Sequence, residues 1–306
     1  MNLGTALALG LLATAGPAHS ADKARPAITG ISHIAVYTSD AAAADHFYGT
    51  ILGGRKASDP ESAAGVRYYF SPQQFVEVLP LPANAGINRL SHTAYNTVDA
   101  AGLRRWVIAH GIDTASKLEK GADGSSWFST FDPEGNEVQF VQPGTRDATA
   151  EPSAISGRMI HVGFMAKDRA RLDTFYRTVF GFRPYWYGAM QDDHTDWVSQ
   201  QVPDGRDWLE YMMVGGTSTV APDQVDQRRL GVLNHFSLGV TNMQASVTQL
   251  FRENRMSQRR DGPQMGRDGK WQTNLYDPDG TRVELMEWHA TTKPCCSEFT
   301  AEDPDG

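Results

Sequence analysis

Four segments of the chain alternate apolar and polar positions in the way that predicts β-strands, and each segment contains one histidine. These histidines are His33, His92, His161 and His235. Side chains two residues apart on a strand share a face, and the residue two positions after each histidine is small. These small residues are Ala35, Ala94, Gly163 and Ser237. The opposite face carries bulkier apolar residues, so the pattern predicts strands with one packed side and one open side that suits the wall of a site.

Other motifs repeat together with the histidine strands. A helical run that starts with Asp, contains Phe-Tyr and ends with Gly occupies residues 40–53 and recurs at residues 168–181. The turn sequence Asp-Pro-x-Gly stands at 132–135 and again at 277–280, before a final strand in each case. Repetition at fixed offsets is the signature of a chain built from repeated supersecondary units. The sequence therefore predicts two copies of a pair, or four modules, each in the order strand, helix and three strands.

Local signals add detail to the third and fourth modules. Asp168 is predicted to be the N-cap of one helix, and the next module's helix is predicted to start near Asn242. Proline and glycine in the Asp-Pro-x-Gly sequences favour tight turns. Alternation along the last strand places three polar or flexible side chains on one face. These residues are Arg282, Glu284 and Met286.

Composition and charge narrow the function classes. The length of 306 residues predicts about two domains, and a hydrophobic content of 40% is typical of a globular chain. A net charge of −8 argues against a nucleic-acid partner, because phosphate contacts require clustered Lys and Arg. Composition therefore disfavours nucleic acid as a partner, and the sequence is compatible with a homo-oligomer.

The N-terminus predicts export. Residues 3–15 are mostly apolar, and Ala-His-Ser at 18–20 fits the small-x-small pattern of a signal-peptide cleavage site. The apolar run is short for a spanning helix, which needs about 20 residues, and no other segment is apolar enough to cross a membrane. We expect a signal peptide at residues 1–20, a linker at 21–29, and a periplasmic or secreted mature protein.

The two cysteines, Cys295 and Cys296, are adjacent and lie in a polar C-terminal tail, residues 291–306. An exported protein is in an oxidising compartment, yet a disulfide between neighbours is strained. A vicinal disulfide, a soft-metal contact and a link to another chain are all open alternatives. The interpretation that we favour is a loosely ordered tail without a catalytic role.

The paired modules, the histidine on each first strand and the Asp-Pro-x-Gly turns before the last strands resemble the vicinal oxygen chelate superfamily. This group includes glyoxalase I, the extradiol dioxygenases and the bleomycin-resistance proteins, and the resemblance covers roughly residues 28–289. It implies an α+β fold in which four βαβββ modules pair into two open, U-shaped, barrel-like mixed sheets with flanking helices. The expected domains are residues 30–145 and 155–290, and sheets of this kind enclose a divalent metal.

Carried onto this chain, the resemblance implies a complete metal site in the second domain. Its ligands are His161, Glu210, His235 and Glu284. Two neutral imidazoles and two carboxylates balance the charge of a dication, and this donor set suits Fe, Zn, Ni or Mn. The first domain departs from the pattern, because an amide stands in place of one carboxylate. Its corresponding residues are His33, Glu77, His92 and Gln139. We therefore expect one divalent ion per chain and a weaker or degenerate second site.

These ligands imply chemistry on a small substrate with neighbouring oxygens. We favour a glyoxalase-like lyase or isomerase in which Glu210 acts as the base, with His194 on a polar loop as a further acid–base candidate. A ring-cleaving extradiol dioxygenase, with Fe(II) held by the two histidines and Glu284, is the first alternative. It is weakened because Asn274 stands where the resemblance places a tyrosine. A metal-free binding protein of the resistance type is the second alternative.

Overall fold

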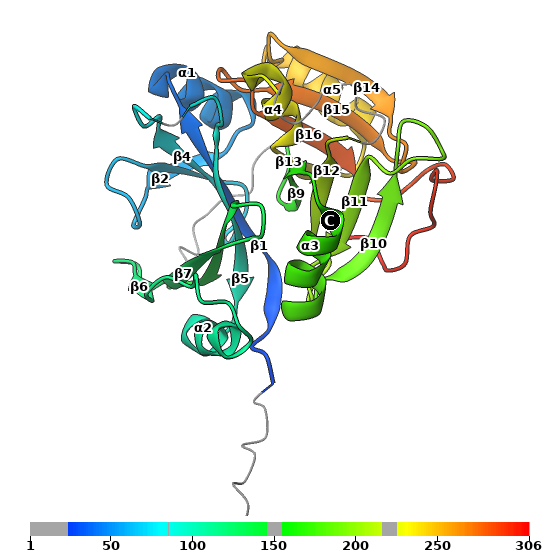
Figure 1. Cartoon of the computed structure of the whole chain (residues 1–306). Coiled ribbons are helices and arrows are strands. Elements are labelled where there is room, and N and C mark those ends of the chain that lie inside the picture. Colours follow the sequence, from blue (N-terminus) through cyan, green and yellow to red (C-terminus); the bar gives the residue numbers. More distant parts are fainter. Residues whose placement is uncertain (1–23, 85, 146–154, 216–224, 306) are drawn as a thin grey trace, which may run out of the picture.

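The computed structural model describes residues 24–84, 86–145, 155–215 and 225–305. These residues form two eight-stranded mixed sheets, one from each half of the chain (Figure 1). Helices flank the sheets, so the predicted α+β architecture of paired modules is confirmed. The predicted signal peptide, residues 1–20, lies outside the described residues. No helix in the described ranges combines the length and the apolar character needed to cross a bilayer.

The first sheet contains the strands of the first two modules in the spatial order β2-β3-β4-β1-β5-β8-β7-β6. In chain order these strands are β1 (Ile28–Thr38), β2 (Arg55–Ser58), β3 (Val66–Tyr69), β4 (Phe75–Pro80), β5 (Leu90–Thr97), β6 (Glu119–Lys120), β7 (Ser126–Phe131) and β8 (Glu137–Gln142). β1 and β5 meet antiparallel at the centre, and each pairs in parallel with the last strand of its own module. Parallel neighbours need a crossover connection, which explains the helix in each module. β1 begins inside the segment predicted as a linker, residues 21–29.

The second sheet repeats this arrangement in the order β10-β11-β12-β9-β13-β16-β15-β14. In chain order its strands are β9 (Met159–Ala166), β10 (Arg183–Gly188), β11 (Trp197–Gln201), β12 (Trp208–Met213), β13 (His235–Val240), β14 (Arg260–Met265), β15 (Trp271–Tyr276) and β16 (Arg282–Glu287). β9 and β13 form the central antiparallel pair, and β12 and β16 are their parallel neighbours. The two halves share one topology, as the internal repeats predict.

The helical segments are α1 (Ala41–Asp45), η1 (His46–Ile51), α2 (Ala100–Ala109), α3 (Arg169–Asp173), η2 (Thr174–Val179), α4 (Gln227–Leu233) and α5 (Met243–Arg252). α1, α3 and α5 begin where the sequence predicts, whereas α4 is an additional helix between β12 and β13. Asp168, the predicted N-cap, accepts a backbone N–H group, and so do Asp40 and Asn242 at the other two predicted helix starts. The helix predicted over 168–181 changes from α to π at η2, where the Phe180 N–H donates to the Phe175 carbonyl. This wider turn buries the adjacent Phe175 and Tyr176 together.

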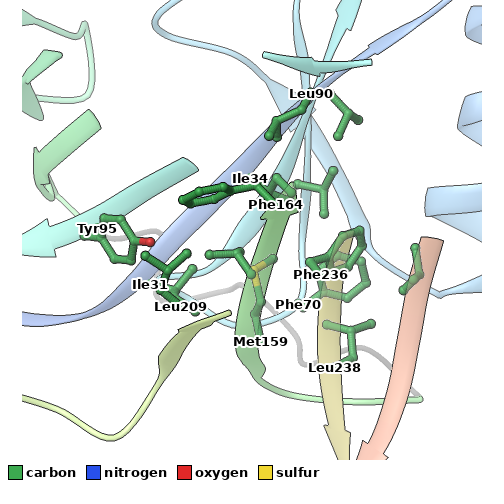
Figure 2. Packing of buried hydrophobic residues seen from close by; sticks show 14 of the residues in the cluster. Ile31, Ile34, Phe70, Leu90, Tyr95, Met159, Phe164, Leu209, Phe236 and Leu238 are labelled. Carbon is green, nitrogen blue, oxygen red and sulfur yellow. The ribbon is translucent and has the colours of Figure 1, made fainter. Parts of the chain in front are cut away.

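The faces of the two sheets that lie opposite the histidines share one apolar core (Figure 2). Its members come from both halves of the chain and include Ile31, Ile34, Phe70, Leu90, Tyr95, Met159, Phe164, Leu209, Phe236 and Leu238. Ile34 and Phe236 directly follow His33 and His235 in sequence, and both are fully buried. Because neighbouring strand residues point to opposite faces, burial of this core turns the histidines to the other face of each sheet. We call the histidine-bearing face of the first sheet the first cup, and that of the second sheet the second cup.

Two repeated motifs meet where the domains join. The Tyr48 hydroxyl in η1 donates to the Asp277 carboxylate at 2.8 Å, and the Tyr176 hydroxyl in η2 donates to the Asp132 carboxylate at 3.3 Å. The tyrosine of each Phe-Tyr motif therefore contacts the Asp-Pro-x-Gly turn of the other domain. The repeats detected in the sequence thus include both sides of the domain interface.

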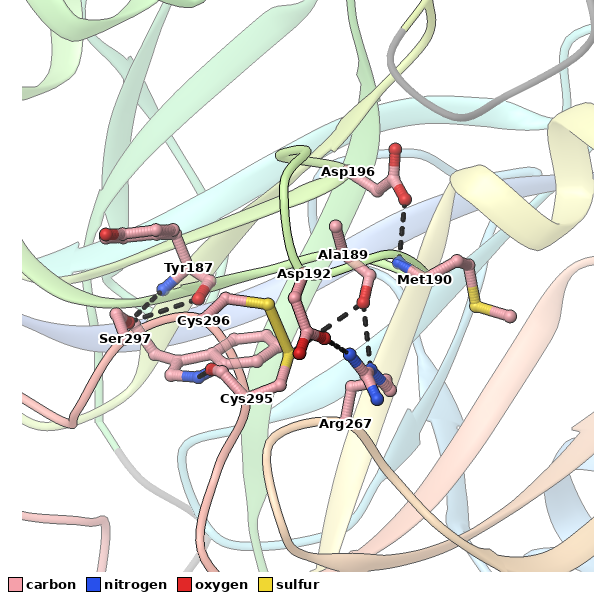
Figure 3. Close-up of a disulfide and its surroundings, with 10 residues drawn as sticks. Tyr187, Ala189, Met190, Asp192, Asp196, Arg267, Cys295, Cys296 and Ser297 are labelled. Carbon is pink, nitrogen blue, oxygen red and sulfur yellow. Dashed lines mark hydrogen bonds and ion pairs between the residues drawn. A yellow bond between two sulfur atoms is a disulfide. The ribbon is translucent and has the colours of Figure 1, made fainter.

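The C-terminal tail packs against the second sheet, and this corrects the expectation of a loosely ordered segment. Cys295 and Cys296 form a vicinal disulfide (Figure 3). The Trp186 indole N–H donates to the Cys295 carbonyl at 3.2 Å, and the backbone N–H of Thr300 donates to the Tyr185 carbonyl at 2.9 Å. β10 is an edge strand of its sheet, and an edge strand has backbone groups free to bond with a passing segment. The tail uses these groups.

A buried ion pair anchors the end of the tail. The ammonium of Lys270, which is fully buried, donates to Asp303 Oδ1 at 2.7 Å and to the Tyr185 hydroxyl at 3.1 Å. It also lies 5.0 Å from the ring centre of Trp208. Trp208 in turn packs against the imidazole of His161, with ring centres 4.7 Å apart. Trp208 is the register partner of His161, so the tail packs beside this histidine on the same face of the sheet.

Candidate metal centre

The four predicted ligands of the second domain lie on adjacent strands. They are His161 on β9, Glu210 on β12, His235 on β13 and Glu284 on β16. The strand register puts Gly163 between Glu210 and His235 in one row of the sheet. It puts Ser237 between His161 and Glu284 in the next row. Because partners in one row and residues two apart on a strand share a face, all four ligands lie in the second cup.

The small residues between the ligands leave room for the rings. A Cβ atom added at Gly163 would lie 2.2 Å from Cε1 of His235, so a larger residue there would displace the imidazole. Ser237 is fully buried between the two other ligands. The small neighbour that follows each histidine in the sequence therefore has a steric reason in the second cup.

The ligand atoms of His161, His235 and Glu284 all lie within 4.8 Å of one another, and Glu210 approaches this group from the side of His235. The Nε2 atoms of His161 and His235 are 3.0 Å apart. Glu284 Oε2 lies 3.3 Å from His161 Nε2, and Glu210 Oε2 lies 3.5 Å from His235 Nε2. The Nδ1 atom of His235 is 2.9 Å from the Leu233 carbonyl. That carbonyl accepts the Nδ1 proton, which leaves the Nε2 lone pair directed at the other ligands.

Burial and nearby charges favour the metal-binding forms of these groups. Burial, followed by the charge of Arg282, lowers the pKa of His235 to about 4. Burial acts to raise the pKa of Glu284, but hydrogen bonding with His161 and the charge of Arg282 outweigh it and lower the pKa to about 2. The pKa of Glu210 is lowered as well, because its contacts with the histidines outweigh burial. Metals bind neutral imidazole and ionised carboxylate, so this donor set fits a divalent Fe, Zn, Ni or Mn ion.

The first cup also gathers two histidines and a glutamate. The Nε2 atoms of His33 and His92 are 3.0 Å apart, and Glu77 Oε2 lies 3.6 Å from His92 Nε2. Gln139 takes the register place that Glu284 has in the second sheet. The fourth donor in the first cup is therefore neutral.

An arginine distinguishes the first cup from the second. Arg67 on β3 is the register partner of Glu77, whereas the second cup has Ser199 beside its corresponding glutamate. The Arg67 guanidinium donates to Asp59 Oδ1 at 2.9 Å and to Glu61 Oε1 at 2.5 Å. A fixed cation thus stands at the ligand cluster of the first cup, held by two carboxylates from the loop that follows β2.

The arginine and its carboxylates also change protonation in the first cup. Burial, followed by the neighbouring Asp59, raises the pKa of Glu77 to about 10. Burial, followed by the charges of His92 and Arg67, lowers the pKa of His33. A neutral Glu77 beside a fixed guanidinium is a poor environment for a dication. These contacts support the expectation of a weaker or degenerate first site.

Each cup contains a cavity. The cavity of the second cup has a volume of about 70 Å³, and its lining includes Trp186, Trp197, Glu210, Arg282, Glu284 and Met286. The cavity of the first cup is larger, about 660 Å³, and its lining includes Arg67, Tyr69 and Phe75. Size alone would favour the first cup, but the complete and ionised ligand set is in the second. We therefore assign the candidate metal centre to the second cup.

A family model matches the chain in two segments, residues 30–140 and 158–285. The model describes the glyoxalase/bleomycin resistance protein/dioxygenase superfamily. The chain belongs to this superfamily. No curated protein sequence matches it. Superfamily membership and the buried His–Glu cluster together indicate a metal-dependent enzyme.

Solved structures of the superfamily fold include dioxygenases and a glyoxalase. Homoprotocatechuate 2,3-dioxygenase from Arthrobacter globiformis has a TM-score of 0.64 at 18% identity, over 90% of this chain and 86% of that chain. The Mn(II)-bound glyoxalase from Novosphingobium aromaticivorans has a TM-score of 0.63 at 16% identity, over 86% and 83% of the two chains. A catechol 2,3-dioxygenase has a TM-score of 0.61 at 15% identity, over 92% and 94%. At these identities the likeness shows the fold.

His194, the further acid–base candidate, lies apart from the ligands. It is on the loop between β10 and β11, where its side chain is 40% exposed and its Nδ1 lies 2.7 Å from Asp193 Oδ1. It is not among the residues that line the cavity of the second cup. The acid–base role of His194 stays a prediction, and no contact with the ligand cluster supports it.

Sequence reasoning misses Arg67 and Ser199. Strand alternation is compatible with either residue on a cup face, but the pairing of β3 with β4 and of β11 with β12 decides which glutamate each one meets. The carboxylates that hold Arg67 come from a loop, and a loop has no periodic pattern from which the direction of its side chains can be predicted. The equivalence of Glu77 and Glu210 in the repeats can be read from the sequence. Their different partners, Arg67 and Ser199, become clear only once the strand pairing is known.

Proposed function

We propose that the second domain holds one divalent metal and catalyses redox-neutral lyase or isomerase chemistry on a small oxygen-bearing substrate. The proposed ligands are His161, Glu210, His235 and Glu284. The buried, convergent atoms of His161, His235 and Glu284 support this assignment, and so does the Glu210 carboxylate 3.5 Å from His235 Nε2.

The carboxylate of Glu210, 3.5 Å from His235, is the observation that carries the proposal. Non-haem iron oxygenases typically use two histidines and one carboxylate and leave several metal positions open. A second carboxylate at the same centre takes one of those positions, which favours non-oxidative chemistry. It also supplies a base beside the substrate.

The chain's own residues have distinct tasks in this reaction. When bound, a divalent metal polarises a substrate carbonyl and makes the neighbouring C–H more acidic. Released from the ligand set, Glu210 would take the proton from that carbon through Oε2 and return it to the adjacent position, so no oxidant is consumed. The Ser199 hydroxyl donates to Glu210 Oε1 at 3.1 Å and holds the carboxylate in place. The lowered pKa of Glu210 keeps it ionised and ready to accept the proton at neutral pH.

A ring-cleaving dioxygenase is the second candidate, supported by the fold shared with homoprotocatechuate 2,3-dioxygenase. In that reaction the two histidines and Glu284 would hold Fe(II), and Glu210 would act as a neighbouring acid–base group. Asn274, which is buried on β15, and the exposed His194 count against it, since neither supplies the acid–base side chain that the resemblance implies. A metal-free binding protein is disfavoured by the ionised ligand set.

Elemental analysis of the purified mature protein tests the metal assignment. We expect about one divalent ion per chain in the wild type, as one four-ligand cage implies. His235→Ala should lose the ion, whereas His92→Ala, the matched change in the first cup, should retain it. Full metal occupancy in His235→Ala would overturn the ligand assignment.

Proton exchange and oxygen uptake separate the two reaction classes. We expect the metal-loaded protein to exchange carbon-bound hydrogens of pyruvate or hydroxyacetone in D₂O, followed by NMR, and Glu210→Gln to abolish the exchange. Oxygen consumption with ring cleavage of a catechol, and no exchange of carbon-bound hydrogens, would favour the dioxygenase and contradict the proposal.

A further inference from the structure

We infer that the second cup is built for a short carboxylic acid, and that Arg282 binds the carboxylate of this substrate. The inference names the substrate class of the proposed function and concerns the same cavity. The expected ligands are 2-hydroxy or 2-oxo acids of a few carbons, which carry the neighbouring oxygens that a metal chelates.

Arg282 is placed beside the ligands but is not one of them. It precedes Glu284 by two residues on β16, and it is the register partner of His235 on β13. It lines the cavity of the second cup together with Glu210 and Glu284. A ligand bound to its guanidinium would therefore lie in the same space as the proposed base.

The Arg282 guanidinium is buried, but its N–H donors are not all matched by acceptors among the described residues. Arg282 is only 9% exposed, and its Nε has no hydrogen-bond partner among the described residues. The one ion pair of Arg282 within the described ranges is with Glu284, at 3.9 Å from Nη1 to Oε1, which is too long for a hydrogen bond. A guanidinium presents five N–H donors in a planar fork that matches a carboxylate. Arg282 thus has donors available in the cavity.

The first cup provides an internal comparison. Its arginine, Arg67, is more deeply buried, at 3% exposed, but is matched by Asp59 at 2.9 Å and by Glu61 at 2.5 Å. The second cup supplies no such pair of carboxylates to Arg282 within the described ranges. Since a buried cation is stable when it is paired and hydrogen-bonded, the missing anion in the second cup is expected to be the ligand.

A second arginine at the cavity, Arg267, has a different assignment. Its Nε donates to the Ala189 carbonyl at 3.0 Å, and its Nη2 is paired with Asp192 (Figure 3). These bonds tie β14 and its turn to the loop after β10. Arg267 therefore forms part of the wall, and Arg282 is the cation left to bind a substrate.

The size and the walls of the cavity limit the length and the polarity of the substrate beyond its carboxylate. A volume of about 70 Å³ is far below the several hundred Å³ of a typical ligand pocket. Trp186, Trp197 and Met286 give it apolar walls. A short carbon chain with an acidic end fits this combination, whereas a bulky thiol conjugate or a large aromatic does not.

Ligand titrations followed by tryptophan fluorescence and calorimetry test the inference, since Trp186 and Trp197 line the cavity. We expect metal-loaded wild type to bind pyruvate or lactate, and Arg282→Gln to weaken this binding about 10- to 100-fold, as loss of a charge-assisted pair predicts. Arg282→Lys should restore part of the affinity. Arg169→Gln, the matched control on α3 away from the cavity, should bind as the wild type does. Hydroxyacetone, which has no carboxylate, should bind Arg282→Gln and wild type alike.

The same titrations separate this inference from the proposed function. Metal analysis of every variant runs in parallel, and each titration is repeated after metal removal by a chelator. Arg282-dependent pyruvate binding in a protein that takes up no metal would support the inference and reject the proposed function. Metal uptake with pyruvate affinity unchanged in Arg282→Gln would reject the inference and leave the proposed function standing. Inorganic phosphate binding more tightly than pyruvate would also reject the carboxylate class.

Discussion

The hydroxyl of Tyr48 in the first domain donates a 2.8 Å hydrogen bond to the carboxylate of Asp277 in the second domain. Both groups are buried. Burial raises the pKa of Asp277 to about 6, so the carboxylate depends on this donor and on nearby backbone N–H groups. Tyr48→Phe should lower the free energy of unfolding by about 1–3 kcal/mol, because it leaves a buried acceptor without its partner.

Chemical denaturation of the metal-free protein measures this loss. Tyr187→Phe is the matched control, since Tyr187 is 41% exposed and its change should have little effect. Equal denaturation midpoints for Tyr48→Phe and Tyr187→Phe would show that the bond does not hold the domains together.

The first cup should gain a metal when its arginine and its amide are replaced. Arg67→Ser with Gln139→Glu gives this cup the residue types that the second cup has in the same register. Elemental analysis should then show an increase from about one to about two divalent ions per chain. The two single variants are the controls, because Arg67→Ser keeps the neutral amide and Gln139→Glu keeps the guanidinium. An unchanged metal content in the double variant would contradict the prediction that Arg67 and Gln139 are what weaken the first site.

Acid should destabilise the metal-free protein partly through His235. Its pKa is lowered to about 4 by burial and by Arg282, against an ordinary value near 6.5. Between these pH values the unfolded chain binds more protons than the folded chain, so stability falls as the pH decreases through this window. The full effect is about 3 kcal/mol.

Urea unfolding at several pH values between 7 and 4 tests this dependence. His235→Asn should show a flatter decline than the wild type over that range. His194→Asn removes a half-exposed histidine and should leave the decline unchanged. A slope in His235→Asn equal to that of the wild type would contradict the prediction.

Neutralising Asp303 should lower the free energy of unfolding substantially, although this residue lies near the end of the chain. Lys270 is fully buried and donates to Asp303 at 2.7 Å, so Asp303→Asn leaves a buried ammonium without its counter-charge. We expect a loss of about 3 kcal/mol in unfolding free energy. The double variant Lys270→Met with Asp303→Asn should recover part of this loss, because it removes the unpaired charge.

Glu302→Gln is the neighbouring control, since the Glu302 side chain is 79% exposed and pairs only with the surface residue Arg206. Thermal unfolding of the variants gives the comparison. A double variant less stable than Asp303→Asn would show that the ammonium has another essential partner.

Strand periodicity and internal repetition predict the architecture and the face on which the histidines lie, and the family resemblance implies the ligand set of the second cup. The alternation that turns Ile34 into the core turns His33 to the cup, and the same rule holds for Phe236 and His235. These are local properties of a strand, so they can be read from sequence. The replacement of a carboxylate by Gln139 is also visible there.

Contacts that depend on long-range packing cannot be read in this way. The role of Arg67 depends on a loop that brings Asp59 and Glu61 back over the sheet. The packed C-terminal tail depends on the buried charge of Lys270, which lies in a short turn with no periodic signal. In both places the pairing of distant polar groups decides the structure.

The bonds from Tyr48 and Tyr176 to the turns of the opposite domains lie on helical segments and turns, away from both cups. Other bonds between the domains come from the sheets, since Gln74 donates to the Met159 carbonyl and Asp207 accepts the Ile31 N–H. A substitution on one histidine-bearing face leaves the two tyrosine bonds in place. One cup can therefore carry a guanidinium where the other carries a hydroxyl without a change at these contacts.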